Sequence, residues 1–215
     1  MAVIAEFESS VFINCPFDDH YAPLLEALVF CVVYAGLKPR LASESLEAGQ
    51  NRLDKIFQLI GSCRYSIHDL SLCRASAVGE YFRMNMPFEL GLDLGYRKSN
   101  VQNGAQKKFL IFEAEPYDLK KALSDIAGQD VAFHRGNFQL VMKSVRDFLR
   151  VEAEVQLPGA AKLESDYATF QGWMTEKKIH EGHSEHEALR IPTRERIDEM
   201  VAWVGLGKPI QFVPV

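Results

Sequence analysis

The stretch Val11-Phe12-Ile13-Asn14 decides the fold, because it is a short apolar run that Pro16 stops two residues later. Residues 19–35 follow with apolar side chains at helical spacing, and Gly36 supplies a C-terminal cap. A buried strand followed directly by a helix is the repeating unit of a parallel sheet with helices on both faces. This stretch therefore predicts an α/β domain.

The same alternation continues along the next part of the chain. We predict further strands at residues 37–42, 64–70, 108–112 and 131–133. We predict further helices at residues 52–62 with Asn51 as N-cap, from Asn85 as N-cap with Pro87 in the first turn, from 116 to about 126, and at 137–151. Pro39 places the second strand at or near a sheet edge. The prediction is a flavodoxin-like fold with five mostly parallel strands and helices on both faces.

The pattern changes after residue 151, and Pro158-Gly159 marks its end. The remaining residues mix charge with modest helical periodicity around 167–178 and 194–204, with Thr193 as the expected N-cap of the last helix. We therefore predict an α/β domain at 1–151 and a helical C-terminal extension at 152–215 that packs on it.

The bulk composition excludes several classes of protein. The chain has 215 residues, of which 47% are hydrophobic, and its formal net charge is -5. No basic stripe suited to a phosphate backbone occurs, so we do not expect a nucleic-acid partner. The apolar run at 24–37 is interrupted by Glu26 and is too short to cross a bilayer, and the N-terminus has no basic region of a signal peptide. We expect a cytoplasmic protein without membrane contact, with its four cysteines reduced.

Three polar segments are expected at the carboxyl edge of the sheet, where open α/β sheets bind ligands. They are residues 14–19, 68–71 and 85–89. Glu89 stands out, because we place it in the first turn of its helix among apolar neighbours, where the helix dipole favours a carboxylate. Gly91 and Gly95 on the same helix suggest close approach to another backbone.

These residues have two interpretations each. Glu89 could stabilise or attack an oxocarbenium-like ribose carbon as an N-glycosidic bond breaks, or it could simply be a helix-start acid. Asp69 could bind a ribose hydroxyl or a base, or it could cap the next turn. Asn14 could likewise only satisfy loop backbone groups. Arg83, the arginine nearest Glu89, could meet a phosphate or a substrate carboxylate, or it could only be solvated at the surface.

Other familiar sites are not indicated. The chain lacks the glycine-rich dinucleotide fingerprint and the phosphate loop, which disfavours a dehydrogenase or an NTPase. His180, His183 and His186 are spaced by three residues, but this spacing drifts around a helix and Gly182 interrupts it. We predict a solvated charged turn there and no metal site.

Three stretches resemble known families. Ser10-Val11-Phe12-Ile13-Asn14-Cys15-Pro16-Phe17-Asp18-Asp19 is similar to the first-strand box of TIR domains, and Ser66-Ile67-His68-Asp69-Leu70-Ser71 is similar to the strand before their third helix. Phe88-Glu89-Leu90-Gly91 resembles the segment with their catalytic glutamate, and also the helix start of nucleoside 2-deoxyribosyltransferases. The order of these matches covers roughly residues 10–113.

The resemblance implies a function that the residues alone leave open. It makes Glu89 the catalytic carboxylate and Asp69 a ribose or base contact, and it places Asn14, Pro16 and Phe17 in the nucleotide pocket. To these substrate-binding candidates we add Arg83 and Asn85. NAD or a nucleoside would be the substrate and no cofactor would be needed; in bacteria such domains often act in antiviral defence.

Two functional hypotheses follow. The first is an N-glycosidase or glycosyl-transferring enzyme, such as an NAD glycohydrolase. The alternative is a non-catalytic nucleotide-binding or scaffold protein of the TIR-like type. In either case we expect a homo-oligomer.

Overall fold

The computed structural model describes residues 2–44, 49–75, 77–79, 81, 83–99 and 103–214, with side chains from Glu6 onward. Its elements in chain order are α1 (Ala2–Ser9), β1 (Ser10–Asn14), α2 (Ala22–Tyr34), β2 (Lys38–Leu41), α3 (Arg52–Ser62), β3 (Tyr65–Asp69), α4 (Asn85–Lys98), η1 (Gly104–Gln106), β4 (Lys108–Glu113), α5 (Leu119–Ala122), η2 (Ser124–Ile126), β5 (Ala132–Phe133), α6 (Phe138–Glu152), α7 (Ala160–His180), α8 (Glu185–Ala188) and α9 (Thr193–Gly205).

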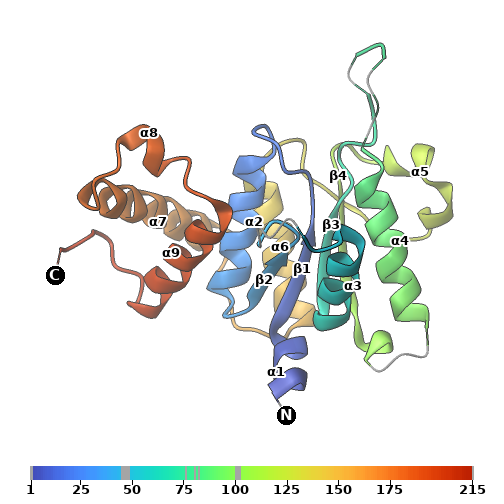
Figure 1. Cartoon of the computed structure of the whole chain (residues 1–215), viewed down its shortest axis with the longest axis horizontal. Helices are drawn as coiled ribbons and strands as arrows, with labels where there is room; N and C mark the ends of the chain where they lie inside the picture. Colours follow the sequence, from blue (N-terminus) through green and yellow to red (C-terminus); the bar gives the residue numbers. More distant parts are fainter. Residues whose placement is uncertain are drawn as a thin grey trace.

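The five strands form one parallel sheet in the order β2-β1-β3-β4-β5 (Figure 1). This is the flavodoxin-like strand order, so the predicted fold class is confirmed. β2 lies at the edge of the sheet, as Pro39 predicted. Proline has no backbone N–H, so it is tolerated in a strand that has a neighbour on one side only.

The sheet is covered on both faces because successive side chains of a strand point to opposite sides. Val11 and Ile13 of β1 belong to the hydrophobic cluster that includes α2 and α6, whereas Phe12 packs with Ile56 and Ile60 of α3. Figure 1 shows α3 and α4 on one side of the sheet and α2 and α6 on the other. All five residues of β1 and of β3 are buried, including the polar Asn14, His68 and Asp69.

Helix α2 lies between the sheet and the C-terminal helices (Figure 1). Its Phe30 ring stands 5.1 Å from Tyr167, 5.7 Å from Phe170 and 5.9 Å from Trp203, measured between ring centroids. One hydrophobic cluster therefore continues from the sheet through α2 to α7 and α9. A helix with partners on two sides is apolar around most of its circumference, as the run at 24–33 is.

Several predicted helix limits are wrong. α2 begins at Ala22 and not at 19, because the Asp18 carboxylate accepts the amide of Tyr21 and holds a turn before the helix. The single helix predicted at 116–126 is the short helix α5 followed by the 3-10 turn η2. There, Glu113 accepts the amides of Tyr117 and Leu119, and Tyr117 takes a positive φ of 69°.

The C-terminal part is more helical than its weak periodicity indicated. α7 extends over Ala160–His180, and neither α8 nor the N-terminal α1 was predicted. Thr193 is the first residue of α9, with Pro192 in the cap position, so its predicted role as N-cap is wrong. No helix within the described ranges combines the length and apolar composition that a bilayer span requires.

Candidate functional site

The carboxyl ends of β1 and β3 bring two of the predicted site residues side by side. Asn14 ends β1 and Asp69 ends β3, and the register pairs Asn14 with His68. In this strand order the chain leaves β1 and β3 toward opposite sides, which makes this edge the topological switch point. The site is therefore built around these two strand ends.

A buried polar chain starts at Asn14. Its amide Nδ2 lies 3.0 Å from His68 Nδ1 and donates to the Met86 carbonyl at 2.9 Å. Since Nδ2 is a donor, His68 Nδ1 must accept, and the ring proton resides on Nε2, which lies 3.2 Å from Asp93 Oδ2. These polar contacts connect β1 and β3 to α4 and use both donors of the Asn14 amide.

This series of buried polar contacts ends at Lys107, whose side chain is fully buried. Its Nζ lies 3.1 Å from Asp93 Oδ1 and donates to the carbonyls of Ile60 and Cys63 at 2.7 and 2.6 Å. Burial alone would raise the pKa of Asp93, but the His68 hydrogen bond and the Lys107 charge outweigh it and hold that pKa below its usual range. Asp93 is therefore a buried acid whose charge is offset by the Lys107 ammonium and the His68 hydrogen bond.

Asp69 is held in a second buried cluster. Tyr21 donates its hydroxyl to Asp69 Oδ2 at 2.6 Å, Ser71 donates its amide to Oδ1 at 2.8 Å, and His134 Nε2 lies 3.1 Å from Oδ2. Burial favours a higher pKa for Asp69, but His134 and these hydrogen bonds leave it lowered. The carboxylate has little capacity left for a ligand in this conformation.

Cys15 shows that the acids of the site lie near one another. Burial is the main cause of its raised pKa, and the negative charges of Asp69, Glu89 and Asp18 raise it further. The thiol is 1% exposed. Cys15 thus lies among acids from three chain segments and is a protonated, inert thiol at neutral pH.

Glu89 lies deeper in its helix than predicted. α4 begins at Asn85 after Met84, so Asn85 is not the N-cap, and Glu89 is the fifth helical residue and not part of the first turn. The free amides of the helix start therefore do not explain its charge. The predicted close approach at Gly91 and Gly95 is also wrong, because a Cβ at either position would meet nothing within 4 Å.

The Glu89 carboxylate is poorly compensated for its burial. Glu89 is 6% exposed, and its ion-pair partner in the described part of the chain is Arg52, whose Nη2 lies 3.7 Å from Oε1. Burial raises the pKa of Glu89, and Arg52 opposes this only in part. A raised carboxyl pKa beside a cavity is a common feature of functional sites.

A cavity of about 240 Å³ opens at Glu89 between α3 and α4. Its lining residues are Arg52, Leu53, Ile56, Asn85, Phe88 and Glu89. Asn85 is exposed, and Phe88 presents 56% of its surface to solvent. The cavity therefore combines a buried acid, an exposed cation and an apolar wall.

The other predicted site residues do not line this cavity. Asn14 contacts α4 through its hydrogen bond to the Met86 carbonyl. Pro16, two residues after Asn14, is also buried. Phe17 is partly exposed. Arg83 lies 3.8 Å from Asp18 and lines a separate apolar cavity with Leu70 and Leu119. The structure thus gathers Asn14, Asp69 and Glu89 at one edge without opening them into one pocket.

Sequence reasoning missed the residues that hold this edge together. Tyr21, His134, Asp93 and Lys107 come from four separate segments, and none has a local motif. His68 had a signal, because a histidine in a buried strand needs polar partners within the protein. The sequence could not name those partners.

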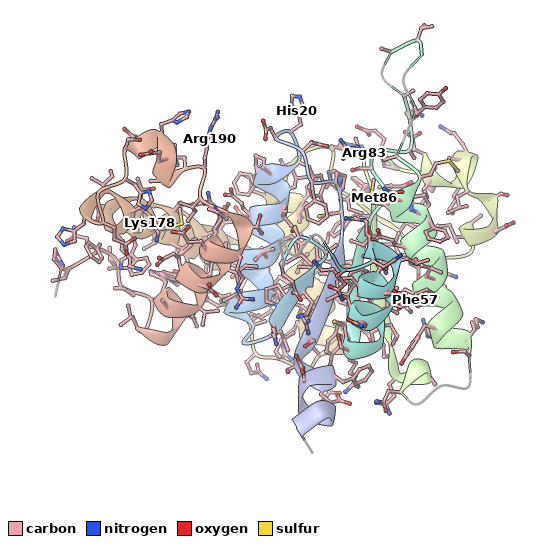
Figure 2. The ribbon with its side chains drawn as sticks, viewed as in Figure 1. His20, Phe57, Arg83, Met86, Lys178 and Arg190 are labelled. Carbon is pink, nitrogen blue, oxygen red and sulfur yellow. The ribbon has the colours of Figure 1, made fainter. Side chains whose placement is uncertain are left out.

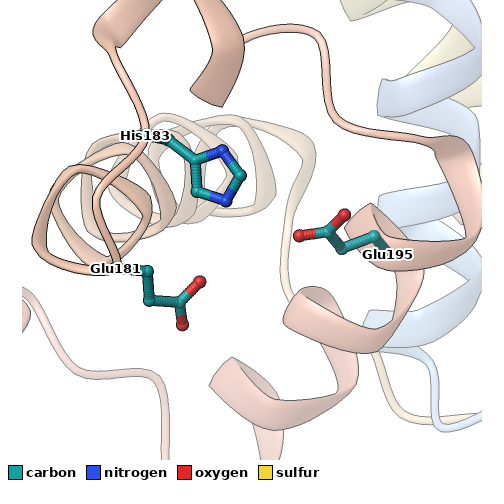
Figure 3. A group of neighbouring side chains, drawn as sticks. All are labelled: Glu181, His183 and Glu195. Carbon is teal, nitrogen blue, oxygen red and sulfur yellow. The ribbon is translucent and has the colours of Figure 1, made fainter.

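The extension contains a separate cluster of potential metal ligands (Figure 3). The ligand atoms of Glu181, His183 and Glu195 all lie within 4.8 Å of one another. The Lys178 ammonium lies 2.8 Å from Glu181 Oε2 and 2.7 Å from Glu195 Oε1, and it also pairs with Glu199. Burial lowers the pKa of Lys178, but these hydrogen bonds outweigh it and leave that pKa raised. The ammonium occupies the place of a cation, so the cluster is an ion-pair network between α7 and α9.

Comparisons with protein-family models, curated proteins and solved structures gave no match. The function is therefore argued from the geometry and from the motif resemblances.

Proposed function

We propose that the chain is an N-glycosidase for a nucleotide or nucleoside, such as NAD, with Glu89 as the catalytic carboxylate. One observation carries the proposal: Glu89 is only 6% exposed, yet it lines a cavity at the carboxyl edge of the sheet. In such a site a carboxylate has more effect on a developing positive charge than it would in water.

The reaction would use the charge of Glu89 directly. As the bond between ribose C1′ and the base nitrogen breaks, its electron pair leaves with the nitrogen, and a carboxylate oxygen stabilises or attacks the cationic carbon. Water then adds to C1′, releases a proton and frees the carboxylate. Arg52 is the positioning residue here, because it favours the ionised form of Glu89 that this step needs.

The substrate class rests on the lining of the cavity and on the motifs. The exposed Phe88 ring offers a surface on which a base could stack, and Asn85 and Arg52 offer polar groups at the mouth. The segment Phe88-Glu89-Leu90-Gly91 resembles the catalytic segment of TIR domains and of nucleoside 2-deoxyribosyltransferases. A role in bacterial antiviral defence is part of this proposal only through that resemblance.

The test is cleavage of NAD and of a panel of nucleosides, followed by liquid chromatography. We expect wild type to release the base and Glu89→Gln to lose roughly a thousandfold in rate, as enzymes do without their main reacting group. Glu115→Gln is the control, because Glu115 is an exposed acid paired with Arg135 outside the cavity. If wild type leaves every substrate intact at stoichiometric protein, the enzyme proposal is wrong.

A second candidate is a non-catalytic nucleotide-binding or scaffold protein. The burial of Asn14 and Asp69 favours it, because their polar groups already bind protein partners. The exposed apolar side chains of Leu53, Phe57 and Phe88 on α3 and α4 offer a surface for self-assembly. Nucleotide binding or growth of an oligomer without substrate loss would support this candidate over the enzyme.

A further inference from the structure

A second cavity lies between α2 and the C-terminal extension, away from Glu89. Its volume is about 410 Å³, within the range of small-molecule sites. Its lining residues are Asp19, Ala22, Leu25, Glu26, Val29, Leu189, Arg190, Ile191, Thr193, Arg196, Ile197 and Met200. Figure 2 shows Arg190 and His20 at the same upper side of the molecule, one on each side of this junction.

The inner wall of the cavity contains an ion pair between the buried Arg196 and the partly buried Glu26. Arg196 is 4% exposed, and its Nε lies 3.2 Å from Glu26 Oε1. Its Nη2 donates to the Leu189 carbonyl at 2.9 Å, which ties the loop before α9 to the helix. Glu26 also accepts from Gln171 at 3.2 Å. This wall is therefore preformed and has no net charge.

The rim of the cavity has two charges of opposite sign. Asp19 lies on the α2 side and Arg190 on the side of the loop before α9, and both are exposed. Within the described ranges, neither side chain forms an ion pair or a hydrogen bond. With Glu26 and Arg196 included, the four charges of the lining cancel. The floor between them is apolar, formed by Leu25, Val29 and Met200.

We propose that this cavity binds a small apolar zwitterion of the class of a free apolar α-amino acid. The apolar side chain would occupy the floor, the ammonium group would face Asp19 and the carboxylate would face Arg190. A ligand with only a negative or only a positive group would leave one of the two rim charges without a partner. Because the charges of the lining cancel, a net charge on the ligand would not strengthen binding. This inference does not depend on the proposed glycosidase activity.

The ligand side of the test uses calorimetric titration and thermal shift on the full chain. The probes are L-leucine, L-methionine and L-phenylalanine up to about 10 mM. The matched probes are N-acetyl-L-phenylalanine, which lacks the ammonium, and L-phenylalaninamide, which lacks the carboxylate. We expect at least one amino acid to bind and both single-charge analogues to bind about tenfold more weakly. Equal binding of the analogues, or no binding of any amino acid, would overturn the proposal.

The protein side of the test uses exposed residues that can change without loss of the fold. Asp19→Asn and Arg190→Gln should each weaken amino-acid binding about tenfold, since a charged hydrogen bond at the rim is lost. Ala22→Phe should abolish binding by filling the cavity. Asp198→Asn and Arg194→Gln are the matched controls, because that exposed pair lies on α9 outside the cavity lining. If the controls weaken binding as much as the rim variants, the site is elsewhere and the proposal is wrong.

Discussion

Two buried acids one helical turn apart have opposite electrostatic environments. Glu89 and Asp93 both lie on α4, four residues apart and on the same face of the helix. Asp93 has His68 and Lys107 at 3.2 and 3.1 Å, and its pKa is lowered. Glu89 has only the exposed Arg52 at 3.7 Å in the described part of the chain, and its pKa is raised.

The difference separates an acid whose charge is compensated by its neighbours from one whose charge is poorly compensated. A buried carboxylate with a lysine and a histidine contributes to stability, because removing one partner leaves another charge uncompensated. A buried carboxylate with weak compensation destabilises the folded state in its ionised form. Glu89 is the acid of the second kind.

The largest effect is expected from Asp93→Asn. The substitution keeps the shape but leaves the Lys107 ammonium buried without its counter-ion, and we expect a loss of about 3–5 kcal/mol in the free energy of unfolding. Urea unfolding measures it. A loss below about 1 kcal/mol would show that the buried polar contacts from Asn14 to Lys107 do not stabilise the fold.

The pH dependence of this effect has a definite sign. Because the folded-state pKa of Asp93 is lowered, its contribution to stability is present above its unfolded-state pKa and is lost as the pH falls through the folded-state value. The difference between wild type and Asp93→Asn should therefore shrink on acidification.

Glu89→Gln should act in the opposite direction. Because burial raises the folded-state pKa of Glu89, the ionised form costs stability, and the substitution should increase the free energy of unfolding by about 1 kcal/mol at neutral pH. The stability of wild type should fall as the pH rises from the ordinary glutamate range through the raised pKa. The gain in the variant should therefore disappear in acid. A destabilised Glu89→Gln at neutral pH would remove the contrast with Asp93.

The smallest effect on stability is expected from Arg52→Gln. The Arg52 side chain is 62% exposed, so the loss should stay below about 0.5 kcal/mol. The pKa of Glu89 should nevertheless rise, because Arg52 is the group that lowers it. Titration of the Glu89 carboxyl by NMR in wild type and variant measures this shift. Arg135→Gln, an exposed arginine paired with Glu115, is the control and should leave the titration unchanged.

Local sequence was sufficient for the main elements of the α/β fold. Asn51 was predicted as an N-cap, and its side chain accepts the amides of Leu53 and Asp54 at the start of α3. Asn137 plays the same role for α6. These signals are local, since a cap and the helix that it begins are adjacent in sequence. The helix prediction failed where a nearby side chain accepts backbone amides without a standard cap motif, as Glu113 does for Tyr117 and Leu119 between β4 and α5.

The sequence by itself determined the strand-helix alternation, the edge position of Pro39 and the meeting of Asn14 with Asp69 at one sheet edge. These follow from hydrophobic period and from the rules of parallel sheets, which need no knowledge of particular contacts. Only the tertiary structure decided that Lys107 compensates Asp93 and leaves Glu89 almost alone, and that Asp69 is held by Tyr21 and His134. The charge state of a buried acid depends on what surrounds it in space, and those neighbours come from segments far apart in the chain.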